Sequence, residues 1–246
     1  MKVIGVIPSR YSSTRLPGKP LKDICGKSMV QRVYERAKQS KLLDEVIVAT
    51  DDKRIVEEVE RFKGKAVMTS VDHSNGTSRI AEAVKNLDVD LVINIQGDEP
   101  FIRFEMIDEL TEILIKNNNI LIATLCYELH EKNKFRDENV VKVVRDVHGN
   151  ALYFSRSLIP FPRKKENYKV YEHIGIYGYK KSFLQEFVKL DDTPLSTIES
   201  LEQLKVLEYG YKLYVAKTKY DYNALSIDTQ EDLEEARRII KKRKEK

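Results

Sequence analysis

One loop concentrates basic side chains in a chain that is otherwise almost electrically balanced. Between positions 10 and 27 it carries five cations and the single acid Asp23. These cations are Arg10, Arg15, Lys19, Lys22 and Lys27. The hydroxyl residues that follow Tyr11 add hydrogen-bond donors, so the loop predicts a binding site for a polyanion such as a nucleoside triphosphate. The alternative is an ordinary basic surface loop.

An acidic pair, Asp98 and Glu99, follows an apolar run that ends at Ile95. Carboxylates at the end of a strand can hold a hard cation such as Mg²⁺, and the phosphate being transferred then completes the ligand set. Acidic residues are also favoured where a helix begins, because the helix dipole attracts negative charge there. From these residues alone the two interpretations stand equally open.

The common nucleotide-binding and hydrolase motifs are absent. The sequence contains no GxGxxG, HExxH or GxSxG. Gly26-Lys27-Ser28 matches the end of a Walker A motif, but Leu21 stands where the first glycine of that motif belongs. No local motif therefore indicates a nucleotide site of the usual kinds, a zinc protease or an α/β-hydrolase.

Length and composition are those of a folded globular protein. The chain has 246 residues, of which 41% are hydrophobic and 33% charged, so it can bury a substantial core. The net charge of +4 comes from the last six residues, because without them the basic and the acidic residues both number 38. Such a tail is typical of a solvated helix end, and we expect no nucleic-acid partner.

The two cysteines predict a reducing compartment, and the lack of a long uncharged stretch predicts that no segment crosses a membrane. Cys25 and Cys126 belong to no CxxC pair or histidine cluster, so we expect reduced core residues and neither a disulfide nor a zinc site. No stretch of 18 residues lacks charge, and the N-terminus reaches Arg10 too soon for a signal peptide. We therefore expect no membrane insertion and a cytoplasmic location.

The first half must position the loop and the acidic pair. Its hydrophobic periodicity predicts strands over 2–7, 45–50, 65–69 and 91–95, alternating with helices over 28–39, 52–62, 77–87 and 104–115. This alternation is typical of βαβ units with a parallel sheet covered on both faces. The basic loop and the acidic pair then follow two strands of one sheet, at the edge where such sheets bind ligands.

The second half is less regular. We expect strands over 120–129, 140–144 and 174–179, and helices over 182–190, 199–209 and 229–242. No Gly/Ser/Pro-rich linker and no repeat of fixed period separates the halves, so we expect one domain with an inserted or appended β element.

Eight segments, in order along nearly the whole chain, carry a family resemblance. They cover residues 7–21, 49–52, 72–79, 96–100, 154–160, 173–179, 201–204 and 227–229. Together they resemble the 3-deoxy-manno-octulosonate cytidylyltransferases, also called CMP-Kdo synthetases. Eight co-linear motifs are far more specific than any one of them.

The resemblance implies a fold and a reaction. The fold would be of the α/β class, a Rossmann-like nucleotidyltransferase with a mostly parallel central sheet, helices on both faces and a smaller β element in the second half. CMP would pass from CTP to 3-deoxy-D-manno-octulosonate (Kdo), giving CMP-Kdo and pyrophosphate for lipopolysaccharide synthesis. Mg²⁺ would be the cofactor and the protein a homodimer. In a single domain 1–246, residues 1–130 would bind the nucleotide, and residues 131–246 the sugar and the second subunit.

The same resemblance implies roles for particular residues. The nucleotide-binding set would be Pro8, Arg10, Ser12, Lys19, Arg79 and Gln96. The metal ligands would be Asp98 and Asp228, which form the catalytic set together with Arg10 and Lys19. The sugar acid would contact Arg156, His173, Tyr177, Glu202 and Gln203. A guanidinium such as that of Arg156 suits a carboxylate because the two groups pair bidentately.

Ordinary structural roles remain open for several of these residues. His173 begins an apolar strand and could cap it, and Tyr177 could pack in the core, as most strand aromatics do. Glu202 and Gln203 follow a helical pattern, for which an exposed face is the default. Asp228 precedes a predicted helix and could be its N-cap.

The motif around Arg79 departs from the family pattern. The family has Ser-Gly-Thr-Asp-Arg where this chain has Asn75-Gly76-Thr77-Ser78-Arg79. The replacement by Ser78 removes an acid that would orient the arginine, so the local sequence supplies no carboxylate partner for Arg79.

Two other functions use the same first half. A CMP-sialate synthetase would need the same phosphate loop and metal acids, but the segments 154–160 and 173–179 resemble the Kdo enzymes. A non-catalytic nucleotide-binding regulator would bind CTP and release no pyrophosphate.

Overall fold

The computed structural model describes residues 1–13, 15–164, 166, 168–222 and 225–244. Thr14, in the basic loop, and the last two residues of the basic tail lie outside this part of the chain. Within it there are nine strands. They are β1 (Val3–Ser9), β2 (Glu45–Thr50), β3 (Ala66–Met68), β4 (Leu91–Asn94), β5 (Ile122–Glu128), β6 (Lys142–Arg145), β7 (Ala151–Ser155), β8 (Tyr171–Lys180) and β9 (Tyr214–Lys217).

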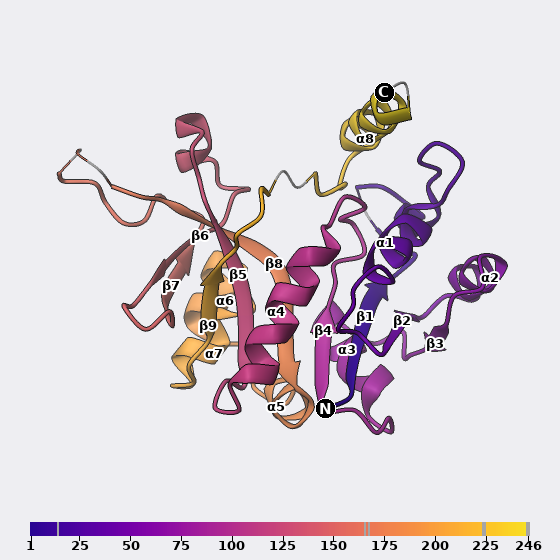
Figure 1. Ribbon diagram of the computed structural model, residues 1–246, viewed down its shortest axis with the longest axis horizontal. Coiled ribbons are helices and arrows are strands. Elements are labelled where there is room, and N and C mark those ends of the chain that lie inside the picture. Colours follow the sequence, from indigo (N-terminus) through magenta and orange to yellow (C-terminus); the bar gives the residue numbers. More distant parts are fainter. Residues whose placement is uncertain (14, 165, 167, 223–224, 245–246) are drawn as a thin grey trace.

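These strands form one sheet at the centre of the molecule (Figure 1). Its main order is β3-β2-β1-β4-β8-β5-β9, and β6 joins β8 and carries β7 beside it. Four of the six pairings along the main order are parallel. The other two join β8 to β4 and to β5 in antiparallel fashion. The predicted mostly parallel sheet is therefore confirmed, and β6 and β7 are the smaller β element.

Helices cover both faces of the sheet, as the sequence predicts. They are α1 (Met29–Ala37), α2 (Lys53–Arg61), α3 (Gly76–Val84), α4 (Phe104–Lys116), α5 (Lys181–Phe187), α6 (Pro194–Glu199), α7 (Leu204–Glu208) and α8 (Gln230–Lys244), with short 3₁₀ turns η1 (Lys19–Leu21) and η2 (Lys132–Arg136). Alternate residues of β1 face opposite cores, because successive strand side chains point to opposite faces. Ile4 and Val6 pack with α3, α5 and α7, while Val3 and Ile7 pack with α1, α2 and α4.

Side-chain caps explain where the helices of the first half begin. The Ser28 hydroxyl accepts from the backbone N–H of Gln31 at the start of α1. The carboxylate of Asp52 and the side-chain carbonyl of Asn75 do the same for α2 and α3. These residue types satisfy the free N–H groups of a first helical turn, which is why the predicted starts are close to the observed ones.

The second half departs from the sequence prediction in places. The predicted helix over 199–209 is wrong at its beginning: α6 ends at Glu199, Ser200 adopts a left-handed conformation with φ of 52°, and α7 starts at Leu204. The strands β7 and β9 and the helix α6 were not expected. Each has at most six residues, too few for periodicity to reveal. The expectation that both cysteines lie in the core holds for Cys126, whereas Cys25 is only half-buried.

Two glycines shape the edge of the sheet beyond β1 and β4. Gly18 has a left-handed φ of 66° and precedes η1, so the basic loop turns back on itself, with the Gly18 N–H donating to Tyr11 O. At Gly97 a Cβ would lie 2.7 Å from the backbone oxygen of Pro8. Only a glycine allows the turn after β4 to come this close to the end of β1. The two segments that the sequence predicted to share an edge therefore lie in contact.

The C-terminal helix packs on the basic loop. Ile227, Leu233 and Ile240 form a small core with Leu16 and Ile24 of that loop. In Figure 1, α8 lies beside α1, far from the N-terminus of β1. This packing carries the segment that precedes α8, including its acid at position 228, to the carboxyl edge of the sheet.

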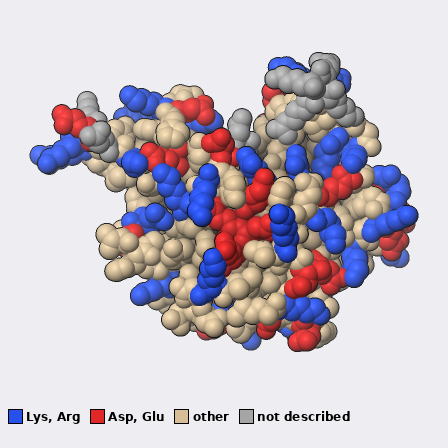
Figure 2. All heavy atoms as spheres, viewed as in Figure 1, with Lys and Arg blue, Asp and Glu red and all other residues tan. Residues whose placement is uncertain are grey.

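The charged side chains are mixed over the surface. Figure 2 shows Lys and Arg scattered across one face, with Asp and Glu gathered near its centre. Several form exposed ion pairs, such as Lys169 with Glu128 at 3.1 Å, which contribute little to stability. Among the described residues no helix is long and apolar enough to cross a membrane.

Candidate active site

A cavity of about 440 Å³ opens at the carboxyl edge of β1 and β4. The nucleotide and metal residues expected from the sequence meet here with one exception. The cavity is lined by Pro8, Arg10, Lys19, Arg79, Gln96, Asp98 and Asp228 of the expected set. Ser12 is not among the described residues that line it, and its neighbour Ser13 is. Distant parts of the chain thus form one polar cavity.

Lys19 joins two acids in this cavity. Its Nζ lies 2.8 Å from Asp98 Oδ2 and 3.0 Å from Asp228 Oδ1. Burial by itself would lower the pKa of Lys19, but the carboxylates of Asp98 and Asp228 outweigh it and raise the pKa above its ordinary value. Lys19 is therefore a fixed cation at neutral pH. Arg15 adds a second cation, with its Nη2 at 3.1 Å from Asp228 Oδ2.

The acids also fit a hard metal ion. Oxygens of Asp98 and Asp228 converge on one point, which the Lys19 ammonium fills in this structure. No group of three His, Cys, Asp or Glu side chains suited to a metal occurs in the described part of the chain. Mg²⁺ is commonly held by only one or two carboxylates, with substrate phosphates and water completing its shell. The residues present suit a metal that arrives with a phosphate ligand.

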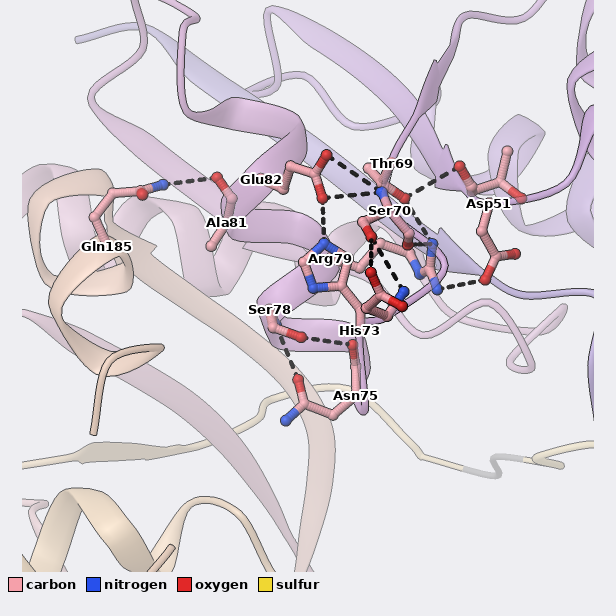
Figure 3. Close-up of polar contacts among 12 residues, drawn as sticks. Asp51, Thr69, Ser70, His73, Asn75, Ser78, Arg79, Ala81, Glu82 and Gln185 are labelled. Atoms are coloured by element: carbon pink, nitrogen blue, oxygen red, sulfur yellow. Dashed lines mark hydrogen bonds and ion pairs between the residues drawn. The ribbon is translucent and has the colours of Figure 1, made fainter. Parts of the chain in front are cut away.

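Arg79 is held by a carboxylate, a hydroxyl and a backbone carbonyl group (Figure 3). Its side chain is 3% exposed, and Nη2 donates to Asp51 Oδ2 at 2.7 Å. Nη1 donates to Thr69 Oγ1 at 2.6 Å and to Ser70 O at 3.3 Å. The acid missing at position 78 is thus replaced by Asp51, which follows β2 and which local sequence could not connect to Arg79.

A smaller cavity of about 150 Å³ adjoins the first and shares Gly76 and Gln96 with it. Three of the residues expected to face the sugar line it: Tyr177, Glu202 and Gln203. It also takes Thr77 and Asn94 from the first half of the chain. β8 brings these halves together, because Tyr177 pairs with Asn94 in the antiparallel register of β8 and β4.

Glu202 links this cavity to the start of α3. Its carboxylate accepts from Asn75 Nδ2 at 3.1 Å and from Thr77 Oγ1 at 2.7 Å. Gln203 is buried, with 7% of its surface exposed. The default prediction for both positions, an exposed face of a helix, is therefore wrong. Both precede α7 rather than lying within a helix, and they turn inward.

Two expected sugar residues lie outside both cavities in the described structure. Arg156 uses its guanidinium on backbone oxygens, with Nε donating to Glu199 O and Nη1 to Glu138 O, each at 2.9 Å. His173 packs between the rings of Phe154 and Tyr177. Burial lowers the pKa of His173 to about 3, so its imidazole is neutral at physiological pH. Thr124 Oγ1 lies 3.1 Å from its Nε2.

Glu99, the second acid of the sequence pair, does not share the position of Asp98. It is buried, and this burial, with the neighbouring charges of Asp98 and Glu172, raises its pKa to about 8. Glu99 is therefore largely protonated at neutral pH. The acidic pair is therefore divided: Asp98 lines the cavity, whereas Glu99 does not line it and is buried.

Several cavity residues were not among the site residues that the family resemblance implied. The larger cavity also contains Ser9, Ser13, Arg15, His73, Asn75 and Gly76. All six lie within the motifs at 7–21 and 72–79, so membership of these motifs was the signal that could have found them. Ser9 Oγ is buried and has no hydrogen-bond partner among the described residues. Asp51 and Thr69 line neither cavity. Asp51 lies within the motif at 49–52, but only the fold shows that it contacts Arg79.

Comparison with known proteins places this site in a class. The family model described as Cytidylyltransferase matches residues 4–219. This match covers most of the chain, including β1 with its basic loop, β4 and the segment of β8 that enters the smaller cavity. The fold and the site thus define a cytidylyltransferase.

The relatives narrow the class further. The chain is 53% identical to the 3-deoxy-manno-octulosonate cytidylyltransferase of Fusobacterium nucleatum, over 98% of both chains. It is 52% identical to the enzyme of the same name from Thermodesulfovibrio yellowstonii, again over 98% of both. A solved structure of CMP:2-keto-3-deoxy-manno-octonic acid synthetase complexed with CTP has a TM-score of 0.94 at 40% identity, and the match covers 99% of this chain and 100% of that one. The chain belongs to the 3-deoxy-manno-octulosonate cytidylyltransferase family.

Proposed function

We propose that this protein transfers CMP from CTP to Kdo and releases pyrophosphate, forming CMP-Kdo for lipopolysaccharide synthesis. The observation that carries the proposal is the junction of two cavities at Gly76 and Gln96. One cavity presents fixed cations and acids, and the other is smaller and lined by hydroxyl, amide and carboxylate groups. A nucleotide in the first and a sugar acid in the second would meet where the cavities adjoin.

The reaction joins the anomeric hydroxyl oxygen of Kdo to the α-phosphorus of CTP. The bond between that phosphorus and the oxygen bridging to the β-phosphate breaks, the hydroxyl proton is released, and pyrophosphate leaves. Such transfers depend on positioning and on stabilising charge rather than on a covalent protein nucleophile. In this chain Arg10, Arg15 and Lys19 line the cavity and supply the fixed positive charge.

The proposed cofactor is Mg²⁺, held by Asp98 and Asp228. When bound it would neutralise charge on the phosphate oxygens. Lys19, which contacts both acids in this structure, would then be free to bind phosphate with its ammonium. Pro8 and Gln96 line the same cavity and would enclose the nucleotide. Arg79 would donate to it from the opposite side.

The sugar acid would occupy the smaller cavity. Glu202 and Gln203 offer hydrogen-bond acceptors and donors to its hydroxyls, and Tyr177 forms part of the wall. Arg156 and His173, although outside the cavity, lie on segments that support it. In the proposed complex Arg156 binds the sugar carboxylate, and its guanidinium leaves the backbone oxygens of Glu138 and Glu199 when the ligand binds.

A homodimer is part of the proposal. Large apolar side chains are exposed on β7, on the segment after it and on α6: Leu152 is 61% exposed, Phe161 83% and Ile198 79%. Hydrogen bonds from Ser155 and Arg156 to Glu199 hold β7 and α6 together. Exposed apolar side chains on these connected segments favour contact with another protein surface, here a second copy of the chain. We also propose a cytoplasmic location, because the two free cysteines are typical of a reducing compartment.

The test is pyrophosphate release by the purified protein with Mg²⁺. Each of the four nucleoside triphosphates is offered with and without Kdo, and CTP is also offered with N-acetylneuraminate. We expect release only with CTP and Kdo together, and CMP-Kdo as the product by mass spectrometry. Release with N-acetylneuraminate instead would identify a CMP-sialate synthetase. CTP binding without turnover would identify a regulator.

A further inference from the structure

Asp51 lies outside both cavities but contacts a residue that lines one of them. We infer that Asp51 is a positioning residue for CTP: it fixes the guanidinium of Arg79 so that the remaining N–H groups of that side chain face the nucleotide. The inference rests on the proposed function, because it concerns the nucleotide of that reaction. It gives a role to a residue of the 49–52 motif that lines neither cavity.

The contact between Asp51 and Arg79 is short and sheltered. Asp51 Oδ2 accepts from Arg79 Nη2 at 2.7 Å, and the two side chains are 17% and 3% exposed. Charge-assisted hydrogen bonds are stronger than neutral ones, and water screens them less when they are sheltered. Asp51 therefore constrains the guanidinium more strongly than an exposed surface acid would.

The bonds that hold Arg79 leave part of its guanidinium unused. A guanidinium has five N–H groups. Within the described part of the chain, Nη1 donates to Thr69 and Ser70 and Nη2 donates once to Asp51. The Nε–H and the second N–H on Nη2 are left for a ligand. Because Arg79 lines the larger cavity, these are the groups it can offer to an acceptor oxygen of CTP.

A second set of contacts keeps the partners of Arg79 in place (Figure 3). Both carboxylate oxygens of Glu82 accept from the backbone N–H of Ser70, at 3.2 and 3.0 Å. His73 pairs with the same carboxylate. The hydrogen bonds from His73 and from Ser70 lower the pKa of Glu82 below its ordinary value. Ser70, whose carbonyl accepts from Arg79, is therefore anchored independently of the nucleotide.

The experiment compares Asp51→Asn with Asp52→Asn, a matched control at the next position. Asp52 caps α2 and pairs with Arg54, Asn is a good cap, and Asp52 lines neither cavity. CTP affinity is measured by calorimetry without Kdo, and steady-state kinetics give KM for each substrate. We expect Asp51→Asn to weaken CTP binding about tenfold and to raise KM for CTP, with KM for Kdo within twofold. Asp52→Asn should change neither.

A double-mutant cycle separates positioning from a general loss of structure. If Asp51 acts through Arg79, then Asp51→Asn should cause no further loss of CTP affinity once Arg79→Gln is present. Asp51→Glu, which keeps the charge, should bind CTP more tightly than Asp51→Asn. Additive losses, or unchanged CTP affinity in folded Asp51→Asn, would overturn the inference.

Unpairing the buried Arg79 could prevent Asp51→Asn from folding. Thr69→Val then decides, because it removes another acceptor for Arg79 without changing side-chain size and without creating an unpaired charge. A folded Thr69→Val with weaker CTP binding supports the inference, and one with normal CTP binding overturns it. Failure of the proposed function can be told apart from failure of this inference, because the wild-type protein would then release no pyrophosphate with CTP and Kdo.

Discussion

The carboxylates of Asp98 and Asp228 bind the same ammonium group. Lys19 Nζ lies 2.8 Å from one and 3.0 Å from the other, although the two acids are far apart in the sequence. Asp98 follows β4, whereas Asp228 lies two residues before α8, which packs on the basic loop. A cation is therefore accommodated between them before any substrate arrives. This arrangement leads to the first two predictions.

Lys19→Ala should lower turnover on the order of 100-fold or more, because a charge directed at a developing phosphate charge contributes roughly 2.7 to 4 kcal/mol in a partly dry site. Pyrophosphate release measures the effect, and thermal unfolding reports whether the variant remains folded. Lys27→Ala is the control, since Lys27 forms an exposed pair with Glu35 and does not line the cavity. If folded Lys19→Ala turns over at the normal rate, the basic loop is not part of the catalytic site.

Asp98→Asn and Asp228→Asn should each shift the Mg²⁺ dependence of turnover to higher concentration, because each removes one of two carboxylate ligands. Their effects should be less than additive, since the second ligand has little metal left to hold once the first is gone. The measurement is turnover against Mg²⁺ concentration for both single variants and the double variant. Additive losses with an unshifted Mg²⁺ dependence would contradict a shared metal. Asp228 would then be an ion-pair partner of Lys19 and Arg15, since the cap at the start of α8 is Thr229, whose Oγ1 accepts from the Asp232 N–H.

His173 should make the free energy of unfolding fall as the solution is acidified. Burial lowers its pKa in the folded protein to about 3, against an ordinary value of 6.5. Between these values the unfolded chain binds a proton that the folded chain does not, so stability is lost as the pH falls below 6.5. In His173→Gln this loss should be smaller, as measured by urea unfolding at pH 4, 5, 6 and 7.

His148→Gln provides the control for that series. His148 lies exposed in the turn between β6 and β7, where replacing its imidazole leaves the core unchanged. Its unfolding curves should follow those of the wild-type protein at every pH. If the wild-type protein and His173→Gln lose the same stability as the pH falls, His173 binds protons as readily in the folded chain as in the unfolded chain, and the prediction is wrong.

Ile198→Glu should convert the proposed homodimer to a monomer. Ile198 is 79% exposed on α6, so a charge there leaves the fold of one subunit intact while burying an unpaired carboxylate in any interface. Light scattering or sedimentation equilibrium gives the mass. Met68→Glu, at an exposed apolar position on the opposite edge strand β3, should leave the mass unchanged. A wild-type protein that is already monomeric would exclude the dimer.

Much of the first half could be predicted from local sequence. β2 has the predicted bounds, and the other elements differ by a few residues, because hydrophobic periodicity and the caps Ser28, Asp52 and Asn75 act over short distances. The second half was less predictable. Short strands such as β7 and β9 owe their formation to neighbours that are distant in sequence, and this information is not present in their own residue pattern.

The sequence by itself determined the order of strands and helices in the first half, the concentration of cations after β1, and the family to which the motifs belong. Only the tertiary structure decided which side chains meet. Antiparallel insertion of β8 beside β4 sets Tyr177 opposite Asn94, the packing of α8 brings Asp228 to Lys19, and the end of β2 supplies Asp51 to Arg79. Local periodicity reports burial along one element. Contacts between elements depend on strand pairing and core packing over long separations, which no single segment of the sequence encodes.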